Sequence, residues 1–409
     1  MSARAVEYLL IGGGLASANC ARWLREEGAD GPILLVGREP DPPYNRPELS
    51  KKYLTGKEPR EDVLFRPDDW WTEQDIDLML RTSVTRLDVN ERVAQLQSGD
   101  EIRFGQALLA TGANVRRLRV EGSELDGIYY LRTFGNSDAI RAAAERAENV
   151  VVIGGSFIGT EVAASLTSIG NRCAIVMQEE TTLERPFGAE VGRFFHGVLE
   201  DKGVDIHGRD EVARIEGDGE HVKKVVTQQG AELDADMIVI GVGVTPDVTL
   251  AKAAGLELAD SGGVKVSARL EASCPDIYAA GDIADYDSVV HGRRLRIEHW
   301  DVAFNQGKTA ALNMVGRNVS HEEIPYFYSD LADWTGLEYV GPGQGRPVFR
   351  GSMDDGEFTA FYIGDDGAVT AALTVGRSDD LDAARRFIRE KSAPDERALT
   401  DLSTDLASL

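Results

Sequence analysis

Two glycine-rich segments have the residue spacing that binds the phosphates of a dinucleotide. The first reads Gly12-Gly13-Gly14-Leu15-Ala16-Ser17, and the second reads Gly154-Gly155-Ser156-Phe157-Ile158-Gly159. In such a turn the first glycine allows a tight bend, and the middle glycine lets the backbone approach a pyrophosphate on the N-terminus of the next helix. One turn of this kind is a weak signal, but two of them predict two bound dinucleotides.

The elements that must position these turns follow the same order in both places. Residues 6–11 and 150–153 are apolar runs typical of buried strands, and a helical pattern follows each turn. Serine replaces one glycine in each turn. Ser17 is small enough for helix and strand to pack closely, whereas we expect the Cβ of Ser156 to crowd the pyrophosphate.

An acid after the second strand of each unit is expected to hold ribose hydroxyls. Strand 33–36 is followed by Arg38 and Glu39, of which we choose Glu39 as the ribose contact. Strand 174–177 is followed by Glu179. A carboxylate here favours the free hydroxyls of NADH, because the 2′-phosphate of NADPH prefers arginine.

Composition excludes several classes of function. The chain has 409 residues, enough for two or three domains, and 44 Lys plus Arg against 69 Asp plus Glu give a formal charge of −25. This charge argues against nonspecific binding to nucleic acid, whose phosphates need Lys and Arg.

The three cysteines, which we expect to be buried, and the six histidines show neither a dithiol nor metal-ligand spacing. We therefore expect no metal and a reducing, cytoplasmic setting. No apolar stretch reaches the roughly 18 residues of a membrane span.

Five further motifs occur along the chain. They are Pro43-Tyr44-Asn45-Arg46-Pro47-Glu48-Leu49-Ser50-Lys51, Ala110-Thr111-Gly112, Ala279-Ala280-Gly281-Asp282, Glu298-His299-Trp300 with Gln306-Gly307, and Phe327-Tyr328-Ser329-Asp330. Together with the two turns, they resemble the two-dinucleotide flavoprotein reductases, in particular the ferredoxin reductases of oxygenase systems and the apoptosis-inducing-factor branch. The resemblance covers essentially the whole chain.

The resemblance implies an α/β fold of the glutathione-reductase type. Two Rossmann-like dinucleotide-binding domains, one for FAD and one for NAD, are followed by a C-terminal α+β domain. The FAD domain is expected to be split over residues 1–112 and 243–325, with the NAD(H) domain inserted at 113–242. Residues 326–409 are expected to form the C-terminal interface domain.

The pattern of the C-terminal residues agrees with this expectation. Short apolar runs at 337–340, 358–363 and 369–375 are separated by Gly and Asp turns, and a helical stretch covers 381–390. These runs predict an antiparallel sheet with a terminal helix.

The resemblance also implies the residues of the site. Lys51 is expected near flavin N5 in an ion pair with Glu161, and Trp300 beside the isoalloxazine; these three are the expected catalytic residues. The other expected contacts belong to the FAD or the NAD site. For FAD they are Gly12, Gly14, Leu15, Ala16, Ser17, Arg38, Glu39, Arg46, Val84, Ala110, Thr111, Gly112, Arg132, Gly281, Asp282, Glu298, His299 and Tyr328. For NAD they are Gly154, Ser156, Phe157, Ile158, Gly159, Glu179, Gly241 and Gly243.

Three positions depart from the family pattern. Arg38 stands where the family usually has an acid, Glu48 where it has a second proline, and Tyr328 where it has a tryptophan. We therefore expect the adenosine ribose contact to have moved to Glu39.

The predicted function is an NADH-dependent FAD reductase that passes electrons to a [2Fe-2S] ferredoxin of an oxygenase or P450 system. The absence of a dithiol argues against a disulfide reductase. Two alternatives stay open: an NADH-sensing flavoprotein similar to apoptosis-inducing factor, and an oxidoreductase acting on a quinone or monodehydroascorbate. The basic cluster Arg293-Arg294 with Arg296 is either a docking patch for ferredoxin or a strand end with satisfied charges. The chain is expected to be a monomer or a homodimer.

Overall fold

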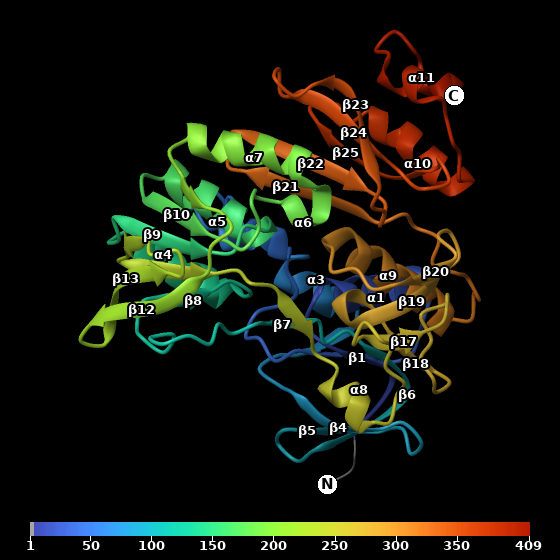
Figure 1. Cartoon of the computed structure of the whole chain (residues 1–409). Helices are drawn as coiled ribbons and strands as arrows, with labels where there is room; N and C mark the ends of the chain where they lie inside the picture. Colours follow the sequence, from blue (N-terminus) through green and yellow to red (C-terminus); the bar gives the residue numbers. More distant parts are fainter. Residues whose placement is uncertain (1–3) are drawn as a thin grey trace. The chain divides into compact units, whose positions relative to one another are not determined.

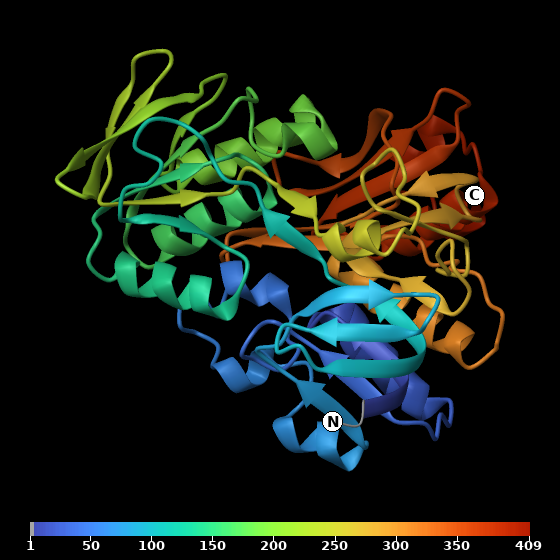
Figure 2. The ribbon, with the colours of Figure 1, turned by 90° about the horizontal axis from the view of Figure 1, so that it is seen from below.

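The computed structural model describes residues 4–409, which fall into two compact units (Figures 1 and 2). Of the described residues, unit 1 comprises 4–45, 61–114 and 245–326, and unit 2 comprises 46–60, 115–244 and 327–409. Each unit is described by itself.

Unit 1 is built on a mainly parallel sheet. The strands of this sheet are β1 (Arg4–Ile11), β2 (Ile33–Val36), β3 (Ile76–Met79), β4 (Val84–Asp88), β5 (Val93–Leu96), β6 (Glu101–Leu109) and β18 (Ile277–Ala279). A separate three-stranded sheet consists of β17 (Val264–Val266), β19 (Ala284–Ser288) and β20 (Arg293–Leu295). The main sheet has the order β3-β2-β1-β6-β5-β4, with β18 paired to β6. Strands β1, β2, β3, β6 and β18 are parallel, while β4 and β5 add an antiparallel hairpin. The strand order reverses at β1, where such sheets bind ligands beyond the carboxyl ends of the strands.

Two helices of unit 1, α1 and α9, pack against each other. The helices of unit 1 are α1 (Leu15–Glu26), α3 (Asp68–Glu73), α8 (Thr249–Ala253), α9 (Trp300–Met314) and the 3₁₀ turn η2 (Gly281–Ile283). The amide of Asn19 on α1 donates to the carbonyl of Phe304 on α9 at 2.7 Å. A Cβ at Gly307 would overlap the carbonyl of Ala16, so the two helices can approach this closely only because glycine lies there.

Unit 2 contains two five-stranded sheets and a small three-stranded sheet. The parallel one has the order β11-β10-β9-β15-β8, and the C-terminal one has the order β21-β22-β25-β24-β23 with antiparallel pairs. The parallel sheet consists of β8 (Ile128–Tyr130), β9 (Asn149–Ile153), β10 (Arg172–Val176), β11 (Asp205–His207) and β15 (Met237–Ile240), beside the small antiparallel sheet β12 (Val212–Asp218), β13 (His221–Thr227) and β14 (Glu232–Asp234). The C-terminal sheet consists of β21 (Tyr326–Leu331), β22 (Thr335–Val340), β23 (Arg346–Ser352), β24 (Glu357–Ile363) and β25 (Val369–Val375).

Unit 2 also contains several helical segments. They are η1 (Arg46–Ser50), α4 (Phe134–Ala144), α5 (Phe157–Ser168), α6 (Glu184–Phe187), α7 (Ala189–Asp201), α10 (Asp380–Glu390), α11 (Glu396–Thr400) and η3 (Leu406–Ser408). Three short elements lie where the chain passes between the units: α2 (Arg60–Val63), β7 (Ala113–Val115) and β16 (Val244–Pro246).

The predicted α/β fold class with its C-terminal α+β part is confirmed. The strands predicted at 33–36 and 369–375 are β2 and β25 with the same bounds, and the helix predicted at 381–390 is α10, which begins one residue earlier. Strands β21 and β23 were not predicted. Among the described residues, no helix is long and apolar enough to cross a membrane.

Candidate active site

The first glycine turn leaves a helix N-terminus open to an anion. Gly12 has φ +128°, and a Cβ there would overlap the carbonyl of Ala110, so only glycine fits. Gly14 is the N-cap of α1, which no side chain among residues 4–409 caps. Outside its own helix and chain neighbours, no described atom lies within 4 Å of a Cβ built at Gly14. The first N–H groups of α1 therefore face space that a pyrophosphate can fill.

Buried polar atoms beside this turn lack partners within the described chain. Ser17 is fully buried, and its hydroxyl has no hydrogen-bond partner in residues 4–409. Gln306 is also fully buried; its Oε1 accepts from the N–H of Gly281 at 2.8 Å, while its Nε2 has no partner among the same residues. Buried polar groups normally have hydrogen-bond partners, so these two unpaired atoms fit a site that binds a polar ligand such as the FAD pyrophosphate.

The residues after β2 engage neighbours within unit 1. Arg38 donates to Asp247 Oδ2 and to Asn114 Oδ1, both at 2.9 Å, and Tyr44 donates to Glu39 Oε2 at 2.6 Å. Asp247 also accepts through its carbonyl from the Thr111 hydroxyl at 2.6 Å. The family acid is thus replaced by a cation that a carboxylate from another segment neutralises.

Trp300 begins α9 and is fixed on two sides. Its Nε1 donates to Asn45 Oδ1 at 3.0 Å, and its ring stacks on Phe304 with centroids 5.4 Å apart and an interplanar angle of 9°. The preceding residue, His299, is the N-cap of α9; burial lowers its pKa to about 4, although the charge of Asp282 opposes the shift. His299 is therefore a neutral imidazole at pH 7.

The second glycine turn repeats the geometry of the first. Gly154 has φ +114°, and a Cβ there would overlap the carbonyl of Gly241. A Cβ at Gly159 would overlap the carbonyl of Gly154, so helix α5 can start close to its strand. Ser156 is the exposed N-cap of α5, and no side chain among residues 4–409 caps this helix.

Lys51 and Glu161 form a buried ion pair in unit 2. Lys51 Nζ lies 3.0 Å from Glu161 Oε1, and the side chains are only 8% and 3% exposed. Two serines complete the coordination of the carboxylate: Ser50 donates to Oε2 at 2.5 Å and Ser329 donates to Oε1 at 2.6 Å. The Lys51 ammonium also lies 5.1 Å from the ring centroid of Tyr328. A buried ion pair is tolerated only when its remaining hydrogen-bonding capacity is used, as it is here.

Further acids surround this pair. Burial raises the pKa of Asp330, although nearby Lys51 opposes the shift. Burial, together with a hydrogen bond to Glu58, also raises the pKa of Glu48, the residue that replaces a family proline. The Lys51 ammonium therefore acts on the carboxyl groups of Asp330 and Glu48 and lowers the pKa of each, against the effect of burial.

A model of the pyridine nucleotide-disulphide oxidoreductase family matches residues 6–307, and a reductase C-terminal model matches residues 326–409. The chain belongs to the pyridine nucleotide-disulphide oxidoreductase family. A similar relative is the ferredoxin–NAD(+) reductase component of the anthranilate 1,2-dioxygenase system from Burkholderia cepacia, 34% identical over 98% of this chain and 98% of the relative.

Solved structures of this oxidoreductase family agree with the assignment. The ferredoxin reductase for the CYP199A2 system from Rhodopseudomonas palustris has a TM-score of 0.94 and 33% identity, covering 98% of this chain and 99% of that one. A covalent putidaredoxin reductase–putidaredoxin complex has a TM-score of 0.93 and 31% identity, covering 100% of this chain and 98% of that one. The recognition from sequence motifs is confirmed.

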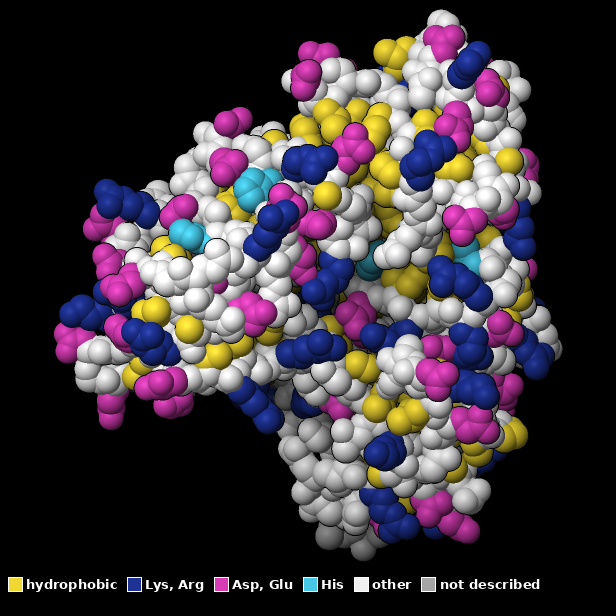
Figure 3. All heavy atoms as spheres, viewed as in Figure 1, with side chains coloured by type: hydrophobic (Ala, Val, Ile, Leu, Met, Phe, Trp, Pro, Cys, Tyr) yellow, Lys and Arg dark blue, Asp and Glu magenta, His cyan; other side chains and the backbone are white. Residues whose placement is uncertain are grey.

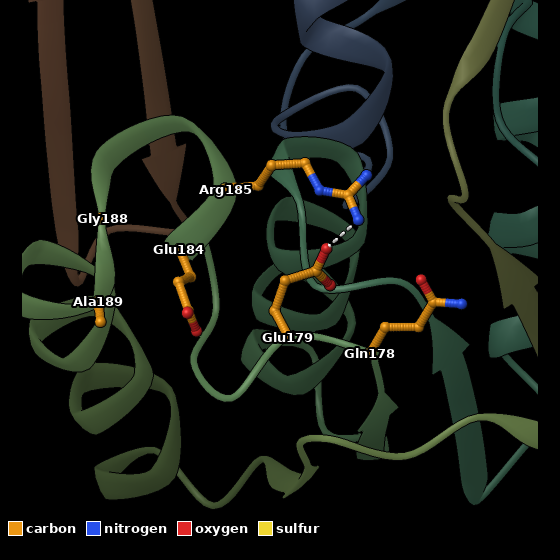
Figure 4. A pocket seen from close by; sticks show the side chains of 6 residues that line it. All are labelled: Gln178, Glu179, Glu184, Arg185, Gly188 and Ala189. Atoms are coloured by element: carbon orange, nitrogen blue, oxygen red, sulfur yellow. Dashed lines mark ion pairs between the residues drawn. The ribbon is translucent and has the colours of Figure 1, made fainter. Parts of the chain in front are cut away.

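Within the oxidoreductase scaffold, a hollow of about 410 Å³ lies beyond the carboxyl end of β10 (Figure 4). Its walls are formed by Gln178, Glu179, Glu184, Arg185, Gly188 and Ala189. The predicted ribose acid Glu179 therefore lines a pocket, in which it forms an ion pair with Arg185 at 2.6 Å.

The remaining predicted residues occupy definite places in the structure. Arg46 and Arg132 meet in unit 2, where Arg46 Nη1 donates to the carbonyl of Arg132 at 2.7 Å. Val84 begins β4, Gly112 accepts through its carbonyl from the N–H of Asp247, and Gly243 follows β15. Glu298 accepts from Arg296 at 2.5 Å. None of these contacts tests cofactor binding directly, so the assignments stay predictions.

The structure bears on one open alternative and corrects one expectation from the sequence. In the basic cluster, Arg294 pairs with Asp285 at 2.6 Å and Arg296 with Glu298 at 2.5 Å, so the positive charge is neutralised locally. Of the three free cysteines, Cys20 and Cys173 are buried as expected, but Cys274 is only half-buried. Burial raises the pKa of Cys173 to about 11.

The sequence reasoning missed the groups that hold the predicted residues. They are Ser50 and Ser329 at Glu161, Asn45 at Trp300, Gln306 at Gly281 and Asp247 at Arg38. All but Asp247 lie inside the quoted motifs. A polar residue inside a functional motif is the signal that could have found them.

Proposed function

We propose that this chain is an NADH-dependent, FAD-containing reductase that passes electrons to a [2Fe-2S] ferredoxin or a similar iron-sulfur protein of an oxygenase or P450 system. The observation that carries the proposal is the buried Lys51–Glu161 pair in a chain with two open dinucleotide turns. The ferredoxin reductases similar to it over nearly the whole chain support the proposed acceptor.

The residues divide the work by domain in this proposal. Residues 1–112 and 243–325 hold FAD, residues 113–242 hold NADH, and residues 326–409 offer the surface for the iron-sulfur partner. FAD, when bound, accepts a hydride and gives up electrons one at a time, which couples a two-electron donor to one-electron acceptors. The candidate contacts predicted from the sequence are the groups that would hold both cofactors.

Protein groups supply orientation and electrostatics. Glu161, held by Ser50 and Ser329, keeps the Lys51 ammonium in one place, where it orients and polarises the ring edge. The N-terminus of α9, a helix of 15 residues that begins at Trp300, would favour negative charge on a flavin bound beside it. His299 at its N-cap is neutral, so the positive field at this point comes from the helix end alone.

The proposal includes a cytoplasmic location and a monomeric or homodimeric state. Free rather than paired cysteines support a reducing compartment, because thiols persist there.

The acceptor is the part of the proposal that needs a direct test. NADH oxidation by the FAD-loaded protein is followed with cytochrome c, with and without a [2Fe-2S] ferredoxin, and separately with a quinone or monodehydroascorbate. We expect ferredoxin to raise cytochrome c reduction manyfold and the small acceptors to be poor substrates. Fast turnover of a small acceptor that ferredoxin does not change, or an NADH-dependent change in molecular mass without turnover, contradicts the proposal.

A further inference from the structure

Arg185 lies at the pocket beyond β10, in a position fixed by the backbone. The short helix α6 carries Glu184 and Arg185, and Figure 4 shows Arg185 reaching toward Glu179 while Glu184 points away from this pair. Glu184 Oε2 accepts from the N–H groups of Glu180 at 3.1 Å and Thr181 at 3.0 Å. These bonds tie α6 to the loop that carries Glu179.

The same loop is bonded to the second glycine turn. The N–H of Leu183, the N-cap of α6, donates to the carbonyl of Gly155 at 2.9 Å. The backbone of Arg185 is therefore held on the segment that adjoins the proposed pyrophosphate site. A dinucleotide seated on the turn would extend its adenosine ribose toward the carboxyl end of β10, where Glu179 and Arg185 lie.

Glu179 and Arg185 carry opposite charges, one suited to NADH and the other to NADPH. Glu179 is 25% exposed and Arg185 is 77% exposed, with 2.6 Å between Oε1 and Nη2. A carboxylate accepts hydrogen bonds from the ribose 2′- and 3′-hydroxyls of NADH, whereas a guanidinium binds the 2′-phosphate of NADPH in two-point contact. Exposed pairs of this kind contribute little to stability, so Arg185 can leave Glu179 at small cost.

We propose that Arg185 can bind a ribose 2′-phosphate and that its ion pair with Glu179 opposes this binding. The Glu179–Arg185 pair, rather than the acid alone, then sets the coenzyme preference. The inference rests on the proposed function of the second turn as the NADH site. Glu179 favours NADH in two ways: it accepts from the ribose hydroxyls, and it neutralises the cation that NADPH needs while repelling the phosphate. NADPH should accordingly be a poor but measurable coenzyme.

Binding of two ligand fragments tests the proposal without any redox readout. Isothermal titration of the FAD-loaded protein compares 5′-ADP with 2′,5′-ADP, which differ by a 2′-phosphate. We expect the unchanged protein to prefer 5′-ADP. In Glu179→Gln the affinity for 2′,5′-ADP should rise about tenfold or more, a typical effect of one charge-assisted contact. The double variant Glu179→Gln with Arg185→Gln should lose that gain.

A matched control uses the ion pair at the opposite end of the same strand. Arg172 begins β10 and pairs with Glu148 at 3.1 Å, with both side chains exposed. Glu148→Gln, alone or with Arg172→Gln, should leave the ratio of the two affinities unchanged. If the control variants change the ratio of the two affinities as much as Glu179→Gln does, net charge alone explains the effect and the proposal is overturned.

The outcomes separate this inference from the proposed function. If 5′-ADP binds but Glu179→Gln leaves the 2′,5′-ADP affinity unchanged, or if the gain survives removal of Arg185, the role of Arg185 is wrong and the NADH site stands. If neither fragment binds to the protein or its variants, the assignment of the NADH site itself fails, and this inference fails with it.

Discussion

At the scale of single residues, Lys51 is the group on which the chemistry of the site depends. Its ammonium is buried and pairs with Glu161, and two serine hydroxyls use the other acceptor positions of the carboxylate. Such an arrangement fixes a charge in one place, which a mobile surface lysine does not do.

Replacing Lys51 by Ala should slow the reduction of bound FAD by NADH at least tenfold, because the group that orients the ring edge is lost. The free energy of unfolding should also fall by about 3–5 kcal/mol, since Glu161 is left as a buried unpaired charge. Stopped-flow absorbance and urea unfolding measure the two effects. Lys52→Ala is the control, because the neighbouring Lys52 is exposed. If K51A reduces its flavin at the unchanged rate, Lys51 does not belong to the site.

Ser329→Ala should slow flavin reduction severalfold and shift the flavin midpoint potential, because Glu161 loses one of its donors. Ser329→Thr, which keeps the hydroxyl, should restore both properties. The control is Thr359→Val in the same C-terminal sheet, where a buried hydroxyl donates to Asp380 at 2.7 Å. That variant should lose stability by about 1–3 kcal/mol without a change in potential. An unchanged potential in S329A shows that Ser329 has a structural role only.

At this scale the sequence predicted the reactive residues better than their supports. Lys51 and Glu161 were expected as a pair from the motifs. Ser50 and Ser329 were not predicted as partners, because the resemblance gave a role in this ion pair only to Lys51 and Glu161, and the serines contact Glu161 only in the folded chain. Hydroxyl partners chosen by tertiary approach leave no periodic signal in the sequence.

At the scale of elements, strands with continuous apolar sequences were predicted best. Strand β2 reads Ile-Leu-Leu-Val and is buried throughout, so its bounds follow from hydrophobicity alone. Strand β23 reads Arg-Pro-Val-Phe-Arg-Gly-Ser and buries only Val348 and Arg350. A buried arginine and an internal proline conceal such a strand, because its pairing with β24 rather than its composition defines it.

Helix α9 is anchored by His321, and this contact should make stability depend on pH. His321 is 1% exposed and lies 3.1 Å through Nδ1 from the Thr309 hydroxyl, and burial lowers its pKa to about 4. Between pH 4 and 6.5 the unfolded chain binds the proton that folded His321 refuses. Its contribution to stability is therefore complete above pH 6.5 and is lost as the pH falls.

The slope expected from this one group is about 1.4 kcal/mol per pH unit. Urea unfolding at pH 7, 6 and 5 should show that His321→Gln loses this part of the slope relative to the unchanged protein. His221→Gln, at an exposed position, serves as the control. Equal slopes for H321Q and the unchanged protein would mean that folding does not lower the pKa of His321.

At the scale of the whole molecule, the charge of −25 matters more than any single patch. On the face shown in Figure 3, cationic and anionic side chains are interspersed rather than gathered by sign. Arg294 and Arg296, the strongest basic candidates in the sequence, are already paired with carboxylates. An acidic ferredoxin would therefore meet net repulsion.

The KM for an acidic ferredoxin should accordingly fall as ionic strength rises from about 0.01 to 0.15 M, because the Debye length shortens from roughly 30 to 8 Å. Steady-state cytochrome c reduction over a NaCl series measures it. The KM for NADH over the same series shows how much of the change belongs to the ferredoxin. A ferredoxin KM that instead rises with salt indicates attraction through a basic patch, and Arg293→Gln should then raise it further.

The fold class was predictable from the two strand–turn–helix patterns, whereas the domain boundaries stay a prediction. The two dinucleotide units and the C-terminal sheet were expected from strand, turn and helix patterns. The grouping of Arg46–Arg60 with residues 115–244 was not, because it follows from contacts such as that between Lys51 and Glu161 rather than from the order of the chain.

The central claim is that electrons from NADH reach an iron-sulfur protein through this chain, and anaerobic double-mixing stopped flow tests it most directly. The FAD-loaded protein is mixed with one equivalent of NADH and then with excess oxidised [2Fe-2S] ferredoxin, whose visible absorbance reports its reduction. We predict that two ferredoxin molecules are reduced for each NADH within the turnover time and that the flavin returns to its oxidised spectrum. A flavin that stays reduced while the ferredoxin stays oxidised would contradict the account.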